Sequence, residues 1–329
     1  MHFNAFLLSL IKDYMKLKNI LLILLFTCIS LGLFCQQDKL ITNFMYDKIS
    51  INPGKTGVDM YNSVCATSIY RNQWDKVNGA PNSGVLNLEA NLSRFFRGGV
   101  GVAFYHDAIG FSQQNNLLLN YSYPINIGKT GVLGLGLGLG IMNYGLSPTW
   151  VPPSSISDPS LPVGFTSTNL DANLGAYFKG NNFYAGISST HLSETLLKKK
   201  VNGVNQNYQT ARHFYIMGGK TFNNVLNGKI DAQILIRTDL IKYSFDLNTR
   251  YFYTINNNEF YGGITYRNSD AIGILLGYSP FQKFTIGYSY DISINKLASV
   301  SRGSHEILLK YCFKIKMPQP IISRNPRFL

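Results

Sequence analysis

The feature that most constrains this chain is a two-residue alternation of apolar and polar side chains, which recurs from about residue 60 to residue 315. In residues 284–292 every second position is apolar. The apolar set is Phe284, Ile286, Tyr288, Tyr290 and Ile292, and the other set is Thr285, Gly287, Ser289 and Asp291. Successive side chains of a strand point to opposite faces of a sheet, so this period predicts strands with one apolar face.

Fourteen segments show the alternation, and most reach the roughly 9–11 residues that a tilted strand needs to cross a bilayer. They span residues 61–70, 85–92, 99–107, 114–123, 130–144, 169–179, 182–189, 209–221, 226–238, 243–255, 259–268, 270–279, 284–292 and 305–315. A β protein crosses hydrocarbon only as a closed cylinder, in which every backbone group is paired. We therefore expect an all-β fold, a closed up-and-down transmembrane β-barrel of about 14 antiparallel strands.

The first 35 residues have the pattern of an export signal. Lys16 and Lys18 precede a mostly apolar run over residues 20–34, and the sequence turns polar at Gln36. This pattern is typical of a secretory signal peptide, so we expect cleavage after Cys35. Export together with the expected transmembrane β-barrel indicates the outer membrane. Met15 is an alternative translation start. Acylation of Cys35 is the less favoured alternative, because Phe34 occupies a position that normally holds a small residue.

The connections between segments give an independent test. The four longest, 71–84, 145–168, 190–208 and 293–304, all follow odd-numbered segments. Outer-membrane barrels place short turns in the periplasm and long loops outside, so all four fall at the cell surface if the first strand starts in the periplasm. Both termini are then expected in the periplasm. The chain divides into a periplasmic or lumenal segment (36–60), the barrel (61–315) and a periplasmic tail (316–329).

Composition excludes several functions. Only 14% of the residues are charged, against about a quarter in soluble domains, while 45% are hydrophobic. The formal net charge is +13, but the basic residues are spread along the chain and form one run, at positions 198–200. No nucleic-acid partner is therefore expected. The lysine run lies in an expected external loop, where it is either simply solvated or a contact for anionic surface glycolipid.

The sequence contains no pattern for catalysis. The glycines at 134–140 are spaced GxGxGxG, which is not a phosphate-binding loop, and His305-Glu306 is not followed by the second histidine of a zinc protease. No GxSxG nucleophile motif occurs either. The histidines after residue 35 are expected to be polar lumen or rim residues; they are His106, His191, His213 and His305. We therefore expect no enzyme activity, no cofactor and no metal site.

Two further features have alternative interpretations. In the fifth segment, leucines at 133, 135, 137 and 139 alternate with glycines at 134, 136, 138 and 140. The glycines indicate either strand curvature, which we favour, or space for something packed inside, such as the segment before the first strand. Cys65 and Cys312 lie in the first and last segments, which become neighbours on closure. A disulfide between them is the less favoured outcome, because the register is unknown and disulfide geometry is demanding.

A series of short motifs resembles one known family. They are Gln36-Gln37-Asp38, Phe44-Met45-Tyr46, Ile51-Asn52-Pro53, Arg71-Asn72-Gln73-Trp74, Gly79-Ala80-Pro81, residues 107–110, Arg212-His213-Phe214-Tyr215, Tyr266-Arg267, Asp270-Ala271, Tyr288-Ser289-Tyr290-Asp291, Gly303-Ser304-His305-Glu306-Ile307 and Pro326-Arg327-Phe328. Their order and content are similar to those of the PorP/SprF family of type IX secretion system membrane proteins. Lys39, Asp47-Lys48 and Gly54-Lys55-Thr56 depart from the family pattern.

The resemblance implies a non-enzymatic outer-membrane accessory component of type IX secretion. Such proteins support the secretion and surface attachment of particular cargo, such as adhesins with a C-terminal sorting domain, and serve gliding motility. The implied partners are outer-membrane lipid, the adhesin and the secretion machinery. The candidate partner-contact or structural residues are Arg71, Trp74, Arg267, Asp291, His305, Glu306, Arg327 and Phe328.

Two hypotheses complete the interpretation. The tail from residue 318 to residue 329 cannot continue the last strand, so we expect it to dock onto the secretion machinery. The alternative function for the whole chain is a passive outer-membrane pore or solute channel, which requires an open lumen.

Overall fold

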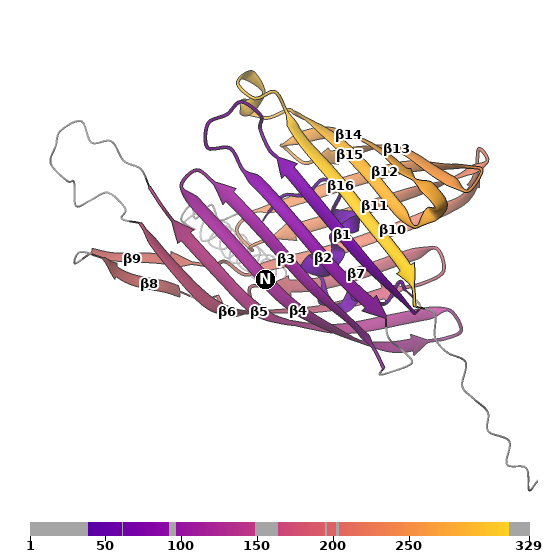
Figure 1. The fold of residues 1–329 in the computed structure, drawn as a ribbon, viewed down its shortest axis with the longest axis horizontal. Helices are drawn as coiled ribbons and strands as arrows, with labels where there is room; N and C mark the ends of the chain where they lie inside the picture. Colours follow the sequence, from indigo (N-terminus) through magenta and orange to yellow (C-terminus); the bar gives the residue numbers. More distant parts are fainter. Residues whose placement is uncertain are drawn as a thin grey trace, which may run out of the picture. The chain divides into compact units, whose positions relative to one another are not determined.

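The computed structural model describes residues 39–60, 62–91, 97–148, 164–194, 196–201 and 204–315. Fourteen antiparallel strands form one closed barrel (Figure 1). They are β1 (Ser63–Asn72), β2 (Asn82–Asn91), β3 (Gly99–Ile109), β4 (Ser112–Ile127), β5 (Gly131–Leu146), β6 (Phe165–Lys179), β7 (Phe183–Thr190), β10 (His213–Val225), β11 (Gly228–Thr238), β12 (Tyr243–Ile255), β13 (Asn258–Arg267), β14 (Ala271–Ser279), β15 (Phe284–Ser293) and β16 (Ser304–Lys314). The predicted fold class is thus confirmed. The predicted segments match these strands one for one, with ends that differ by up to four residues, as in 114–123 against Ser112–Ile127.

The barrel closes between its first and last strands. β1 pairs with β16 from Ser63 opposite Lys314 to Asn72 opposite His305. This register places Cys65 directly opposite Cys312, and the two cysteines form a disulfide. The pairing that the sequence left as the less favoured alternative is therefore present, because the register that decides it is set by closure of the whole barrel.

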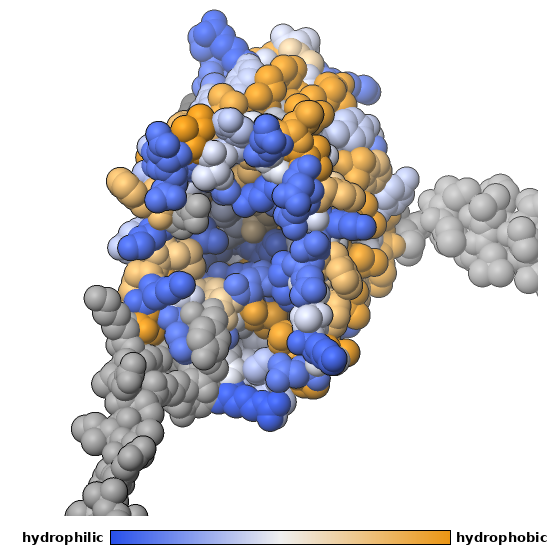
Figure 2. All heavy atoms as spheres, turned by 90° about the vertical axis from the view of Figure 1, so that its right-hand side faces the viewer, coloured by the Kyte–Doolittle hydropathy of each residue, from blue (hydrophilic) through white to orange (hydrophobic). Residues whose placement is uncertain are grey.

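The two faces of the wall differ as the alternation predicts. Large apolar side chains point outward and are exposed, with Leu139 54% and Ile264 64% accessible, whereas Asp246 is 1% accessible on the inner face. Figure 2 shows a hydrophilic hollow surrounded by apolar atoms at one end of the barrel. An apolar outer band and a polar interior are the arrangement that a lipid bilayer requires of a barrel. In the described part of the chain, no helix is long and apolar enough to span a membrane.

The two ends of the barrel have connections of different length. At one end, here called the turn end, β1 begins and β16 terminates, and the turns at 128–130, 180–182 and 256–257 are short. The opposite end, here called the loop end, carries the connections 73–81, 147–164, 191–212 and 294–303. The long connections therefore gather at one end, as predicted.

One of these connections is not simply a loop. Within the expected loop 190–208 the chain forms a separate two-stranded sheet of β8 (Leu196–Val201) and β9 (Val204–Gln209). The three lysines at 198–200 are therefore in a strand that pairs with residues 205–207, not in a loop. This short hairpin escaped prediction because its side chains do not alternate between apolar and polar.

Residues 39–60 lie inside the barrel and are here called the plug. The plug contains η1 (Phe44–Tyr46), α2 (Lys48–Ile51) and η2 (Pro53–Lys55), and Figure 1 shows these turns within the ring of strands. Its first residues lie beside the loop-end halves of the strands, and its last residues reach the turn end, where β1 begins. The first described residues of the plug therefore lie in the loop-end half of the lumen, and the expected periplasmic N-terminus lies outside the described residues. The export signal (1–35) and the tail (316–329) lie outside the described residues.

The glycines of β5 make room for the plug. A Cβ atom on Gly134 or Gly136 would overlap backbone atoms of Gly54, and one on Gly175 of β6 would overlap the Asn52 side chain. The favoured interpretation, strand curvature, is therefore wrong for Gly134 and Gly136. A side chain is missing there because the backbone of η2 packs directly against the barrel wall.

We predict that Gly136→Val displaces the plug without opening the barrel. Overpacking of this kind costs about 1–3 kcal/mol or more, and the plug is the part that can move. Trypsin should then cleave after Lys48 or Lys55, which the wild-type protein protects. Gly262→Val is the control, because a Cβ at Gly262 meets nothing within 4 Å. Equal protection of both variants would show that the plug does not occupy this contact.

We also predict that the disulfide stabilises the closed barrel. It joins cysteines 247 residues apart, so its loss in Cys312→Ser with Cys65→Ser should lower the free energy of unfolding by about 2–4 kcal/mol. The temperature at which the folded, fast-migrating band disappears on gel electrophoresis measures this change. Reductant should lower that temperature for the wild type and leave it unchanged for the variant. Alkylation of both cysteines in unreduced protein would contradict the pairing.

Candidate functional site: the charge network that holds the plug

Arg71 is the centre of a buried charge network in the loop-end half of the lumen. The guanidinium of this β1 residue lies 2.7 Å from Asp291 of β15 and 3.3 Å from Glu306 of β16. All three side chains are almost completely buried. Closure of the barrel brings them together, because β1 and β15 both flank β16. Two carboxylates around one arginine can share its five donors, so both have a charged partner inside the protein.

Glu306 connects this network to the plug backbone. Its two carboxylate oxygens accept hydrogen bonds from the backbone N–H groups of Thr42 and Asn43, each at 2.8 Å. The Asn43 side-chain amide donates a third bond to the same carboxylate, also at 2.8 Å. A charged acceptor that receives several N–H donors makes strong hydrogen bonds. Glu306 alone therefore makes three hydrogen bonds to the first turn of the plug.

The Thr42 hydroxyl is the second connection. It donates to Asp291 at 2.6 Å and accepts from Arg71 at 2.7 Å and from Arg267 at 3.3 Å. One donor and two acceptor positions are all that a hydroxyl offers, so every one is used. Arg267 at the end of β13 carries the network further, with Asp246 of β12 at 2.9 Å and Asp270 at 3.1 Å. Arg237 of β11 also contacts Asp246.

The rest of the plug is held by polar contacts along its length. Asp47 forms an ion pair with Lys39 at 3.2 Å and accepts a bond from Asn87 of β2. The Asn52 amide donates to two backbone carbonyls of the wall, at 3.0 and 3.1 Å. Nearer the turn end, Lys55 contacts Glu89 of β2 at 2.6 Å. Although burial lowers the pKa of the Lys55 ammonium, Glu89 and Asp59 outweigh burial and raise it above its usual value.

Four of the eight candidate residues from the sequence meet in this network. They are Arg71, Arg267, Asp291 and Glu306. Trp74 is in the connection after β1, where its backbone N–H donates to Ser304, and His305 points outward, with its ring bonded to the Tyr288 hydroxyl at 2.7 Å. Arg327 and Phe328 lie outside the described residues. The structure thus gives the four network residues an internal partner, the plug.

Sequence reasoning missed the plug side of the network. Thr42, Asn43 and Asp47 lie in a segment without strand periodicity, so nothing marked them as wall contacts. Asp246 and Arg250 were visible as charged residues on the polar face of residues 243–255, but their partners were not. Charged side chains on the inner face of a membrane strand were the signal that such partners exist, because they are costly when unpaired.

The four described histidines lie in two different settings. His191 and His213 are buried in the lumen, and His191 lies 2.8 Å from Asp171 of β6. His106 and His305 are on the outward face near the loop end, bonded to Asn115 and Tyr288. Within the described ranges, no group of three or more His, Cys, Asp or Glu side chains is arranged to hold a metal ion.

A closed barrel with an apolar outer face and its own N-terminal segment in the lumen defines the class of plugged outer-membrane barrels. Within this class, the chain belongs to the family described as type IX secretion system membrane protein PorP/SprF, whose model matches residues 33–311. The resemblance seen in the sequence is therefore confirmed. The protein is thus a type IX secretion-associated membrane protein, and its family points to the outer membrane.

Two solved structures are similar to this chain. The CymD monoaromatic hydrocarbon channel is 13% identical, with a TM-score of 0.50 over 83% of this chain and 93% of that chain. A Pseudomonas aeruginosa FadL homologue is 10% identical, with a TM-score of 0.42 over 77% of this chain and 89% of that chain. At this identity the likeness to CymD shows the barrel fold alone. No protein of curated function matches the chain.

We predict that Glu306→Gln loosens the plug. Removal of one partner from a buried ion pair costs about 3–5 kcal/mol, and the neutral amide of the variant would also accept weaker bonds from the plug backbone. Hydrogen exchange of the Thr42 and Asn43 amides, measured by mass spectrometry, should become faster. Glu259→Gln is the matched control, because Glu259 forms a partly exposed pair with Lys229 that is worth at most about 1 kcal/mol. Unchanged exchange in the Glu306 variant would contradict the proposed anchor.

Proposed function

We propose that this chain is a non-enzymatic accessory component of the type IX secretion system that supports the secretion and surface attachment of particular cargo, such as adhesins. The observation that carries the proposal is the plug. Its polar side chains are buried among those of the wall, and Thr42, Asn43 and Asn52 are at most 1% accessible. A plug that is bonded to the wall inside the lumen favours a docking role. The alternative, a passive pore, requires a continuous aqueous path.

The loop end offers a surface for cargo. The connections 73–81 and 294–303 bond to each other: the Asp75 N–H donates to the Gly303 carbonyl at 2.7 Å, and the Arg302 N–H donates to the Asp75 carbonyl at 3.0 Å. These two connections lie directly beyond the ends of β1, β15 and β16, the strands that carry the charge network. Rigid loops on a rigid barrel provide the pre-organisation that binding a folded domain requires.

Exposed apolar side chains on the loop-end connections are the candidate cargo contacts. Leu240 is 74% accessible in the connection between β11 and β12, and Val300 is 61% accessible beside η4 (Lys296–Ser299). Exposed apolar residues at the end of a barrel that faces the cell surface favour a protein partner. Trp74, in the connection bonded to residues 294–303, belongs to the same surface. A role in gliding motility would follow from the cargo.

The tail is the proposed contact with the secretion machinery. β16 ends at Lys314 at the turn end, which by the rule of short turns faces the periplasm. Residues 318–329 would then extend into the periplasm, within reach of periplasmic components. Their deletion should leave the barrel folded and reduce surface delivery of the adhesin.

The proposal is tested by affinity purification of the tagged barrel from detergent-solubilised membranes. An adhesin C-terminal sorting domain should be retained by the wild type. Leu240→Asp with Val300→Asp should reduce its recovery by about tenfold, because charges placed in the centre of an interface weaken binding strongly. Leu226→Asp is the matched control, as Leu226 is an equally exposed apolar residue in the connection between β10 and β11 at the turn end. Failure of the folded wild-type barrel to retain any such domain would contradict the proposal.

A further inference from the structure

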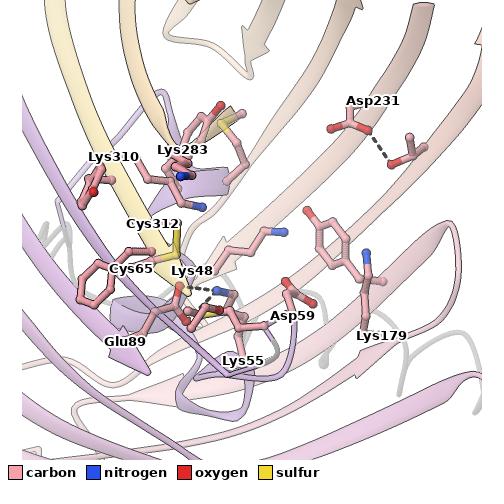
Figure 3. Close-up of a pocket in the computed structure, with 18 of the residues that line it drawn as sticks. Lys48, Lys55, Asp59, Cys65, Glu89, Lys179, Asp231, Lys283, Lys310 and Cys312 are labelled. Carbon is pink, nitrogen blue, oxygen red and sulfur yellow. Dashed lines mark hydrogen bonds and ion pairs between the residues drawn. A yellow bond between two sulfur atoms is a disulfide. The ribbon is translucent and has the colours of Figure 1, made fainter. Parts of the chain in front are cut away.

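A large cavity opens at the turn end of the barrel, below the plug. Its volume is about 1160 Å³, and it is here called the vestibule. It is lined by residues of the plug, by residues at the turn-end parts of several strands and by the Cys65–Cys312 disulfide (Figure 3). Figure 2 shows the same end of the molecule as a hollow with hydrophilic walls. The vestibule is larger than the roughly 300–1,000 Å³ of typical small-molecule pockets.

The plug supplies part of the vestibule wall. Met45, Tyr46, Lys48 and Lys55, all from the plug, form its inner wall. Beyond them lie the buried contacts that hold the plug to the strands, such as the Lys55–Glu89 pair. A ligand that entered from the turn end would meet these plug residues, so the vestibule is suited to holding a ligand. Because the turn end faces the periplasm by the rule of short turns, the ligand would come from that side.

The walls of the vestibule carry an excess of positive charge. Eight basic side chains line it against three acidic ones. Two of the three carboxylates are already paired, Glu89 with Lys55 and Asp231 with Arg250. Six lysines remain that form no ion pair with a described residue; they are Lys48, Lys179, Lys220, Lys283, Lys310 and Lys314. A concave, partly buried site lined by one sign of charge concentrates ligands of the opposite sign.

The positive charges of Lys48 and Lys310 are only partly stabilised by their neighbours. Lys48 reaches out from the plug, and its ammonium stacks 3.5 Å from the centre of the Tyr184 ring. Burial lowers the pKa of Lys48 to about 7, which Asp59 only partly opposes. Lys310 of β16 lies 5.5 Å above the Tyr46 ring. Aromatic faces stabilise a cation only in part, and an incoming carboxylate would complete the pairing.

The vestibule is lined by both basic and apolar side chains, which indicates the kind of anionic ligand that would fit it. Tyr46, Tyr184, Met45 and Met60 place apolar surface between the lysines. A peptide that carries acidic and apolar side chains matches such a surface, since an extended chain presents them in alternation. The tail of this chain does not match, because residues 316–329 contain Lys316, Arg324 and Arg327 and no acidic side chain.

We infer that the vestibule is a binding site for an acidic, extended peptide segment of another protein, inserted from the periplasmic side. The lysine ammonium groups bind its carboxylates, and Tyr184 and the methionines contact its apolar side chains. This inference goes beyond the proposed function and does not depend on the identity of the cargo, since it concerns the opposite end of the barrel. It gives the barrel a second partner, on the side from which secreted proteins arrive.

The test uses the purified full-length protein in a neutral detergent and a fluorescein-labelled ten-residue peptide of alternating Glu and Tyr. Fluorescence anisotropy should show saturable binding that weakens as salt rises, because salt screens ion pairs. Lys220→Glu, Lys283→Glu and Lys314→Glu together should weaken binding by about tenfold or more, as each exposed pair contributes up to about 1 kcal/mol. These lysines are exposed at the mouth, so their replacement leaves the barrel fold intact.

The control is Lys296→Glu, an exposed lysine in η4 at the loop end, which should leave binding unchanged. A peptide of alternating Lys and Tyr should not bind. Displacement of the acidic peptide by inorganic phosphate at equal concentration would show a general anion site and overturn the inference. So would equal binding to the wild type and the triple variant, or no binding to the wild type.

Discussion

The arrangement of this protein depends on the buried carboxylate of Glu306. A carboxylate inside a membrane barrel is strongly destabilising unless it is paired and hydrogen-bonded. The wall supplies only part of what Glu306 needs, through Arg71, and the plug supplies the rest, through two backbone N–H groups and the Asn43 amide. Without the plug, Glu306 would lack three hydrogen-bond donors, and without the barrel, the N–H groups of Thr42 and Asn43 would lack their acceptor. Closure of the barrel and occupation of the lumen are therefore coupled, and the charges specify where the plug lies.

This coupling separates the two ends of the molecule. The plug lies between a loop end with mutually bonded connections and a turn end with a basic vestibule. A channel requires a continuous aqueous path between these two spaces, and the proposed function rests on the plug lying in that path. The same barrel fold occurs in CymD, which is described as a hydrocarbon channel, and one fold can carry different functions. The proposed function therefore rests on the contents of the lumen and the chemistry of the two ends, and not on the strands.

Sequence alone predicted the wall well because the bilayer imposes a local rule. Each strand must alternate on its own, so residues 243–255 or 284–292 could be assigned without knowledge of any other segment. The plug follows no such rule. Thr42 and Asn43 contact residues about 250 positions away, and their short helical turns carry no period. The sequence could not decide whether the disulfide forms, for the same reason. Cys65 lies opposite Cys312 only once the register between the first and last strands is set.

The candidate site was predicted in part. Resemblance to a family identified Arg71, Arg267, Asp291 and Glu306, but it could not say that they meet one another or that they bind the chain's own N-terminal segment. The glycines of β5 show the difference between a pattern that is visible in the sequence and its structural cause. Their alternation with leucine was visible in the sequence, whereas their cause, the backbone of Gly54 against Gly134 and Gly136, depends on long-range packing.

The central claim is that the chain's own N-terminal segment closes the lumen. Single-channel recording of the purified protein in planar lipid bilayers tests it most directly, with a variant that lacks residues 39–58 for comparison. The wild type should show no steady conductance, and the shortened protein should conduct if it still forms a heat-resistant barrel. A stable, ohmic conductance of the folded wild-type protein, equal to that of the shortened one, would contradict the claim.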